Sequence, residues 1–148
     1  MLRPVLGVIV SYAALFFLWS ALFFGAYALL GPERVFQPDS YEVSTVWLGL
    51  TGIITFFGAM AGGYLCACIS RSNRACQVLA FVVFLIAIFL CIKAMRRDVG
   101  GLHIRAGEVT KWEAVDLAVV PTWMHVLNPV IGAAGILLGA RFGFHRKP

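Results

Sequence analysis

Long runs of uncharged, mostly apolar residues are the dominant pattern of this chain. Residues 4–30 and 43–69 each form a run of 27 residues without a charge, residues 76–92 form one of 17, and residues 121–140 form one of 20. A helix needs about 20 residues to cross a hydrocarbon core of roughly 30 Å. The third run reaches this length if its helix continues to Met95, because the long side chain of Lys93 can carry its ammonium to the interface.

These runs predict an all-α integral membrane protein. The alternation over about ten residues that marks membrane β-strands is missing from the sequence. The expected architecture is a bundle of four transmembrane helices, with a short interfacial helix before the fourth. The four spans are expected at about residues 4–30, 43–69, 76–95 and 121–142.

The composition points to the same class of protein. The chain has 148 residues, of which 61% are hydrophobic and 13% are charged, whereas soluble domains carry about 25% charged residues. A domain of this size cannot bury so much apolar surface in one core, because its surface is too large for its volume. Lipid must therefore cover the remainder, and we expect one membrane domain over residues 1–148.

A cleaved signal peptide is the main alternative for the first run. Arg3 would supply its basic start, and Ala26-Tyr27-Ala28 resembles a cleavage site between small residues. The run is much longer than the roughly 7–15 apolar residues of a signal peptide. We therefore expect this segment to be a transmembrane helix, and N-terminal sequencing that begins near Leu29 would contradict that expectation.

The connections between the runs differ in length and character. Residues 31–42 contain two prolines and predict a non-helical loop, while residues 70–75 predict a tight turn between antiparallel helices. Residues 96–120 form the longest connection. Within it, Thr110 and Glu113 have the spacing of a capping box. We expect a surface helix to follow and to end before Pro121, since proline disfavours a helical conformation in the preceding residue.

The distribution of charge predicts the orientation. Four crossings place both termini and the 70–75 turn on one side, which carries six cations and no acid: Arg3, Arg71, Arg74, Arg141, Arg146 and Lys147. The other side carries six cations and all seven acids. The first set lies in short segments, where the positive-inside rule acts most strongly. We expect a multi-pass protein of the cell membrane with both termini in the cytoplasm.

The basic C-terminal tail suggests a partner for the cationic side. Residues 141–147 can bind anionic lipid headgroups, at about 1 kcal/mol per cation near the surface. The sequence pI of about 9.3 reflects an excess of basic residues. Lipid headgroups are a sufficient partner for them, and we expect no nucleic-acid partner.

Small residues at helical spacing form the clearest motifs. In lipid, helices associate by close backbone approach, which small residues permit. We expect these stripes to pack the bundle internally or to bind a partner subunit. The fourth run carries Asn128, Gly132, Gly135, Gly139 and Gly143; the second carries Thr51, Thr55, Gly58, Gly62 and Cys66; the first carries Gly7, Ser11, Ala14, Ala21 and Gly25.

A polar patch marks the start of the fourth run. Thr122, His125 and Asn128 precede Pro129, which cannot donate a hydrogen bond to the carbonyl of His125. The patch is a candidate ligand or proton site, because polar groups in membrane helices are costly. The alternative is that these groups satisfy the helix at the proline or contact water near the headgroups.

Catalytic and metal-binding motifs are not found in the sequence. The four cysteines, Cys66, Cys68, Cys76 and Cys91, show no C-x-x-C spacing and are expected to act as small apolar side chains. A metal or haem site shared by His103 and His125 has no supporting motif. We therefore predict no catalytic residue, no cofactor and no metal.

Three functions are consistent with this pattern. The leading hypothesis is a small non-enzymatic membrane subunit that packs through its small-residue faces within a larger complex or a homo-oligomer, with the outer loop as a docking platform. The first alternative is an oligomeric channel or transporter lined by the second and fourth helices, with Thr51, Thr55, His125 and Asn128 as polar lining. The second is a membrane enzyme or cofactor carrier that uses His103 or His125.

Overall fold

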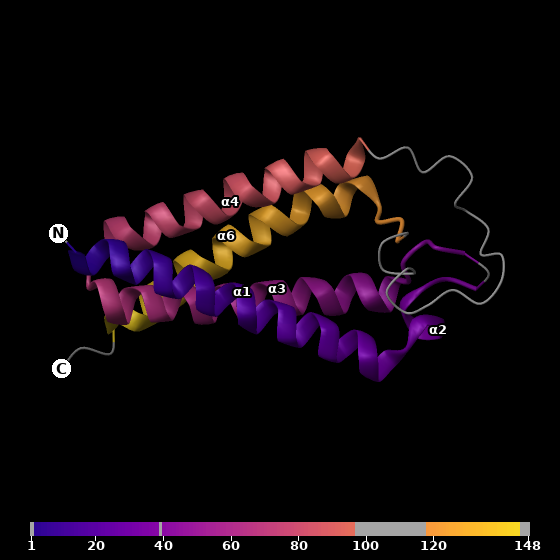
Figure 1. Ribbon diagram of the computed structural model, residues 1–148, viewed down its shortest axis with the longest axis horizontal. Helices are drawn as coiled ribbons and strands as arrows, with labels where there is room; N and C mark the ends of the chain where they lie inside the picture. The colour runs from indigo at the N-terminus through magenta and orange to yellow at the C-terminus, as the bar shows by residue number, and fades with distance from the viewer. Residues whose placement is uncertain (1, 39, 97–117, 146–148) are drawn as a thin grey trace.

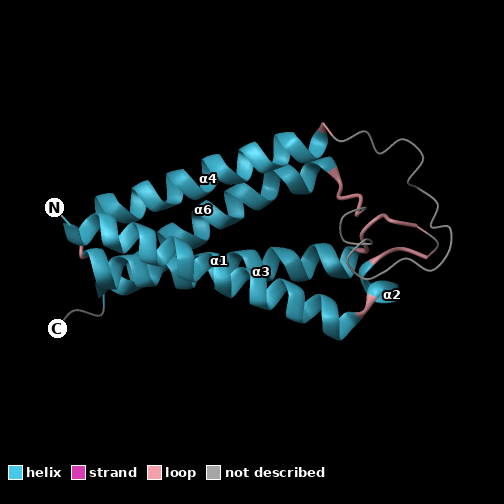
Figure 2. Ribbon diagram, in the orientation of Figure 1, coloured by secondary structure: helices cyan, strands magenta, loops and turns pink. Residues whose placement is uncertain are grey.

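A bundle of four long helices forms the protein. The computed structural model describes residues 2–38, 40–96 and 118–145. The long helices are α1 (Leu2–Leu30), α3 (Thr45–Ser70), α4 (Asn73–Met95) and α6 (Thr122–His145), and α2 (Pro32–Val35) is a single turn. Each long helix has the length and apolarity needed to cross a membrane, so the predicted four-helix membrane fold is confirmed (Figures 1 and 2).

The two ends of the bundle differ in structure. The start of α1, the end of α6 and the turn between α3 and α4 lie at one end, here called the terminal end, whereas α2 and residues 118–121 lie at the other, the loop end (Figure 1). The helices lie close together at the terminal end. Toward the loop end, the α4–α6 pair and the α1–α3 pair diverge (Figure 1).

Local chemistry determines where α3 begins and ends. Ser44 is its N-cap, because its side chain accepts a hydrogen bond from the backbone N–H of Trp47. Val43, which the sequence placed inside the span, instead forms an isolated bridge with Phe36. At the other end Arg71 adopts a left-handed conformation, with φ of 52°, and its N–H donates to the carbonyl of Ala67. This closure leaves a turn so short that α4 begins at Asn73, three residues earlier than expected.

The loop end is held by backbone pairing around a second core. Val119 donates its N–H to the carbonyl of Tyr41 at 2.9 Å and accepts from the N–H of Val43 at 3.2 Å. Beneath this pairing lies a buried apolar cluster: Tyr27, Val35, Phe36, Val43, Trp47, Leu48 and Met124. These contacts join the loops before α3 and α6 to the helices themselves.

Two expectations for the connections require correction. The first loop is not wholly irregular, since Pro32 begins the helical turn α2, where a proline N–H is not needed. The expected surface helix at 114–120 falls mostly outside the described residues, as does its capping box. Its last part, Ala118 to Val120, is extended, because the backbone of Val119 is paired with Tyr41 and Val43.

The central pair of the bundle is α3 and α6, which run parallel. Gly52 lies near Met124, Gly132 near Thr55, and Gly143 near Ala67, so residue numbers rise together along both helices. About 39% of the most apolar stretch is buried in both α3 and α6, against 22% in α4 and 11% in α1. The outer helices α1 and α4 therefore present most of their apolar surface to the bilayer.

Candidate functional site

The glycine stripes of α3 and α6 are occupied by contacts within the chain. A Cβ at Gly139 would overlap the backbone carbonyl of Met60, and one at Gly135 would lie 2.7 Å from the carbonyl oxygen of Phe56. Gly143 meets the Ala67 side chain in the same way, at 2.7 Å. The stripe of α6 therefore packs directly on the backbone of α3.

The α3 stripe faces a different neighbour. A Cβ at Gly62 would lie 2.8 Å from the Leu15 side chain, and Gly58 lies beside Trp19, so this stripe receives α1. The α3 glycine that touches the α6 backbone is Gly63, which was not among the predicted small residues, and a Cβ there would overlap the carbonyl of Ile136. The signal for Gly63 was its direct adjacency to Gly62, which offers small residues on two faces of one helix.

The small residues of α1 divide into two groups. Gly7 is buried against Ser70, where an added Cβ would lie 2.7 Å from the serine Cβ. Ala21, Gly25 and Ala28 are exposed on the half of α1 nearer the loop end, and a Cβ built at Gly25 meets no atom within 4 Å among the described residues. This second group, the α1 stripe, is a small-residue surface that the described part of the chain does not cover.

The polar patch of α6 is not one cluster of side chains. Thr122 is exposed, whereas His125 and Asn128 are half-buried. The carbonyl of His125, freed by Pro129, accepts a hydrogen bond from the thiol of Cys91 on α4 at 2.9 Å. The side-chain oxygen of Asn128 is buried and has no hydrogen-bond partner in the described part of the chain.

The threonines expected to line a channel have their hydroxyls bound. Thr51 donates to the carbonyls of Trp47 and Leu48, at 2.9 and 3.0 Å, and is buried. Thr55 accepts a hydrogen bond from the indole N–H of Trp19 at 3.2 Å. This interhelical bond also gives the indole nitrogen of Trp19 a polar partner inside the bundle.

A cluster of thiols and hydroxyls lies at the terminal end and was not predicted. Cys66 and Cys76 are both fully buried, and the Cys76 thiol lies within interaction range of the Cys66 thiol and the Ser70 hydroxyl. The tight turn explains the meeting, since both cysteines stand five residues from Arg71 in an antiparallel helix hairpin. Equal distance from the turn was the signal that could have identified this pair.

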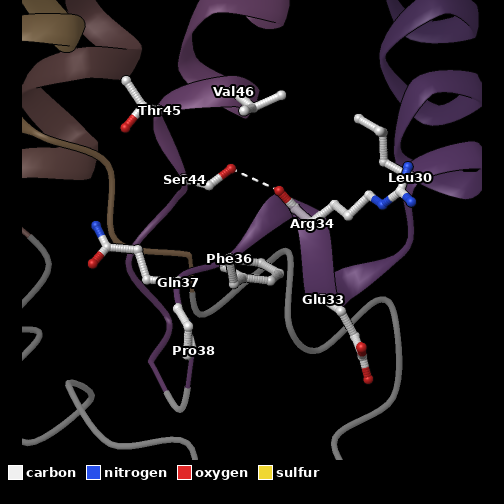
Figure 3. A pocket seen from close by; sticks show the side chains of 9 residues that line it. All are labelled: Leu30, Glu33, Arg34, Phe36, Gln37, Pro38, Ser44, Thr45 and Val46. Atoms are coloured by element: carbon white, nitrogen blue, oxygen red, sulfur yellow. Dashed lines mark hydrogen bonds between the residues drawn. The ribbon is translucent and has the colours of Figure 1, made fainter.

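An open hollow of about 660 Å³ lies at the loop end, between the end of α1 and the start of α3 (Figure 3). Its lining combines apolar side chains with exposed polar ones, including Glu33, Arg34 and Gln37. Ser44 donates a hydrogen bond to the backbone carbonyl of Arg34 at 2.7 Å and so ties the two walls together (Figure 3). The hollow is wide and shallow, with no converging set of polar groups from its described lining.

A metal site built from three or more ligands is not found in the described ranges. No three histidine, cysteine or acidic side chains among residues 2–38, 40–96 and 118–145 come close enough to hold an ion. The metal or haem site suggested for His103 and His125 lies outside the described residues, because His103 is not among them.

Comparisons with known proteins give no guide to the activity. No family model matches the chain, and neither does any curated protein or solved structure. The function must therefore be inferred from the packing of the helices and the chemistry of their side chains.

Proposed function

We propose that the chain is a small non-enzymatic membrane subunit that packs a partner's transmembrane helix against α1, within a larger complex or a homo-oligomer. The observation that supports this proposal is the uncovered α1 stripe of Ala21, Gly25 and Ala28. The buried stripes of α3 and α6 are already filled by other helices of the same chain. They are therefore not free to receive a partner.

The physics of helix association in lipid favours this surface. Apolar side chains gain little by leaving lipid for one another, so helices associate where backbones can approach closely. The α3–α6 pair shows this chain using small residues in that way. The α1 stripe has the same steps of four and three residues, on the helix with the least burial of the four.

The orientation proposed with this function places both termini in the cytoplasm. Arg3, Arg71, Arg74 and Arg141 belong to the terminal end, in short segments where the positive-inside rule is strongest. The basic tail that begins at Arg141 would contact anionic headgroups of that leaflet. A C-terminal reporter that fluoresces only in the cytoplasm tests this orientation, and a dark fusion protein would contradict it.

A pore between α3 and α6 of one chain receives no support from the contacts. The two backbones touch at Gly63 and Gly139, which leaves no room for a file of water molecules at those levels. The hydroxyls of Thr51 and Thr55 are already engaged in hydrogen bonds.

Native mass spectrometry after extraction in a mild detergent tests the subunit proposal. We expect the wild-type chain to emerge with a stoichiometric larger polypeptide or with a second copy, and the two masses distinguish these partners. Gly25→Leu should abolish the association without unfolding the chain, since a Cβ at this position meets no described atom within 4 Å.

Ala13→Leu is the matched control for that variant. Ala13 is also an exposed small residue of α1, but it lies about 120° around the helix from Gly25. This variant should keep the partner. A wild-type chain that is monomeric and alone, or a Gly25→Leu chain that retains its partner, would refute the proposal.

A further inference from the structure

The Cys66–Cys76 pair is a chemically distinct feature of the bundle interior. Both thiols are shielded from solvent and lipid, at 0% exposure, and both are free rather than joined in a disulfide. They come from different helices, belong to one buried cluster and lie beside each other across the α3–α4 hairpin. Two adjacent sulfur atoms inside a membrane bundle are potential ligands for a soft metal ion.

Two serine hydroxyls stand beside the thiols. The Ser70 hydroxyl lies 4.0 Å from the Cys66 sulfur and donates to the Cys66 carbonyl at 2.6 Å. Ser11 of α1 is fully buried, and its hydroxyl has no hydrogen-bond partner among the described residues.

The register of α1 on α3 places Ser11 at this cluster. Gly7 lies against Ser70, and Leu15 lies against Gly62. The helices are antiparallel, so the residue midway between Gly7 and Leu15 stands level with the residue midway between Ser70 and Gly62. These residues are Ser11 and Cys66. An unpartnered hydroxyl therefore lies at the level of the sulfur pair.

We propose that Cys66 and Cys76 bind one monovalent copper ion, Cu(I), between their sulfur atoms. Thiolates are the soft ligands that select Cu(I), and this ion accepts two ligands in a line. A structural zinc ion needs four ligands in a tetrahedron, which the described residues around the pair do not supply. The unpartnered hydroxyl of Ser11 would donate to one of the bound sulfur atoms.

Binding replaces protons by metal. Cu(I) displaces the proton of each thiol, two copper–sulfur bonds form and two protons leave, so the bound complex carries one negative charge.

The surroundings at the terminal end reduce the cost of that charge. Cys76 lies in the first turns of α4, whose N-terminus is the positive end of the helix dipole. Arg71 and Arg74 flank the turn, and the segments described at this end contain no acidic residue. A buried anionic complex is therefore favoured here over a cationic one.

Anaerobic titration of the purified full chain with Cu(I), in competition with a coloured Cu(I) chelator, tests the proposal. The wild-type chain should bind one ion. Loss of a group that contacts a metal ligand typically lowers metal affinity by roughly 10–100-fold. Ser11→Ala should therefore lower the Cu(I) affinity about 10-fold. Cys66→Ser and Cys76→Ser each remove a ligand itself and should lower it by more than roughly 100-fold. Cys68→Ser and Cys91→Ser are the matched controls and should bind as the wild type does.

X-ray absorption of the copper-loaded wild-type chain provides a test that needs no variant. Two sulfur neighbours at one distance are expected, whereas nitrogen or oxygen neighbours, or three sulfurs, would overturn the assignment. Helical circular dichroism of Cys66→Ser and Cys76→Ser separates lost binding from lost folding. Failure of the wild type to compete with the chelator, or undiminished binding by folded Cys66→Ser and Cys76→Ser chains, would also overturn it.

Discussion

Replacing individual glycines by alanine should give a graded loss of stability along the α3–α6 interface. The added methyl group meets no described atom within 4 Å at Gly25 and lies 3.8 Å from the Thr55 methyl at Gly132. It lies 2.7 Å from the Phe56 carbonyl oxygen at Gly135 and overlaps the Met60 carbonyl at Gly139. The obstacles at the last two positions are backbone atoms, which cannot rotate away as a side chain can. Relief therefore requires the helices to separate.

The size of each effect follows from two opposing contributions. Alanine in place of glycine in a helix stabilises by roughly 0.5–1 kcal/mol. Forcing an extra methyl group into a tight contact costs about 1–3 kcal/mol. Gly25→Ala should therefore be neutral or slightly stabilising, and Gly132→Ala should be near neutral. Gly139→Ala should destabilise by up to about 2.5 kcal/mol after the helix gain is subtracted, with Gly135→Ala between Gly132→Ala and Gly139→Ala.

Equilibrium unfolding in mixed micelles measures this series. The free energy of unfolding is read from the loss of helical circular dichroism as a denaturing detergent replaces a mild one. The order of stability matters more than any single value, because all four variants add the same methyl group. Equal stability of Gly139→Ala and Gly132→Ala would refute the backbone contact between α3 and α6.

Three hydrogen bonds give further predictions for the same unfolding assay. Cys91→Ala should cost about 1–3 kcal/mol, because it leaves the part-buried carbonyl of His125 without a donor, while Cys91→Ser should restore most of that stability. Thr55→Val should cost about 0.6 kcal/mol, the average for an interhelical hydrogen bond in a membrane. It should also shift the Trp19 fluorescence to the blue, because the excited indole loses its hydrogen-bond acceptor, and an unshifted spectrum would contradict that bond. Ser44→Ala should cost about 1 kcal/mol through the lost N-cap of α3, and an unchanged unfolding midpoint would show that the cap contributes nothing.

The spans were predictable because they depend on local composition. Any helix that enters lipid must satisfy its backbone internally over about 20 apolar residues, so the uncharged runs marked all four helices. The ends were less predictable. Val43 is apolar enough for a span, but its N–H bonds to the carbonyl of Val119, 76 residues away. No local pattern contains that pairing.

The same distinction applies to the interior. The sequence identifies Gly135 and Gly139 as small residues on one face, because helical spacing is a local property. It does not say that this face meets Gly63 or the Met60 carbonyl, since that depends on which helices become neighbours. Cys66 and Cys76 are an intermediate case, because their meeting follows from the position of one turn.

The parallel pairing of α3 with α6 also determines when the protein can assemble. Two parallel helices cannot be joined by a tight turn, and here α4 and the long connection are synthesised between them. During synthesis, the face of α3 that carries Gly63 must therefore wait in the bilayer for α6 to emerge. That helix is the least apolar of the four, with a mean hydropathy of 1.4 against 2.9 for α4. Its insertion should depend on α3 being already present to receive it, so the bundle is completed only once α6 has been synthesised.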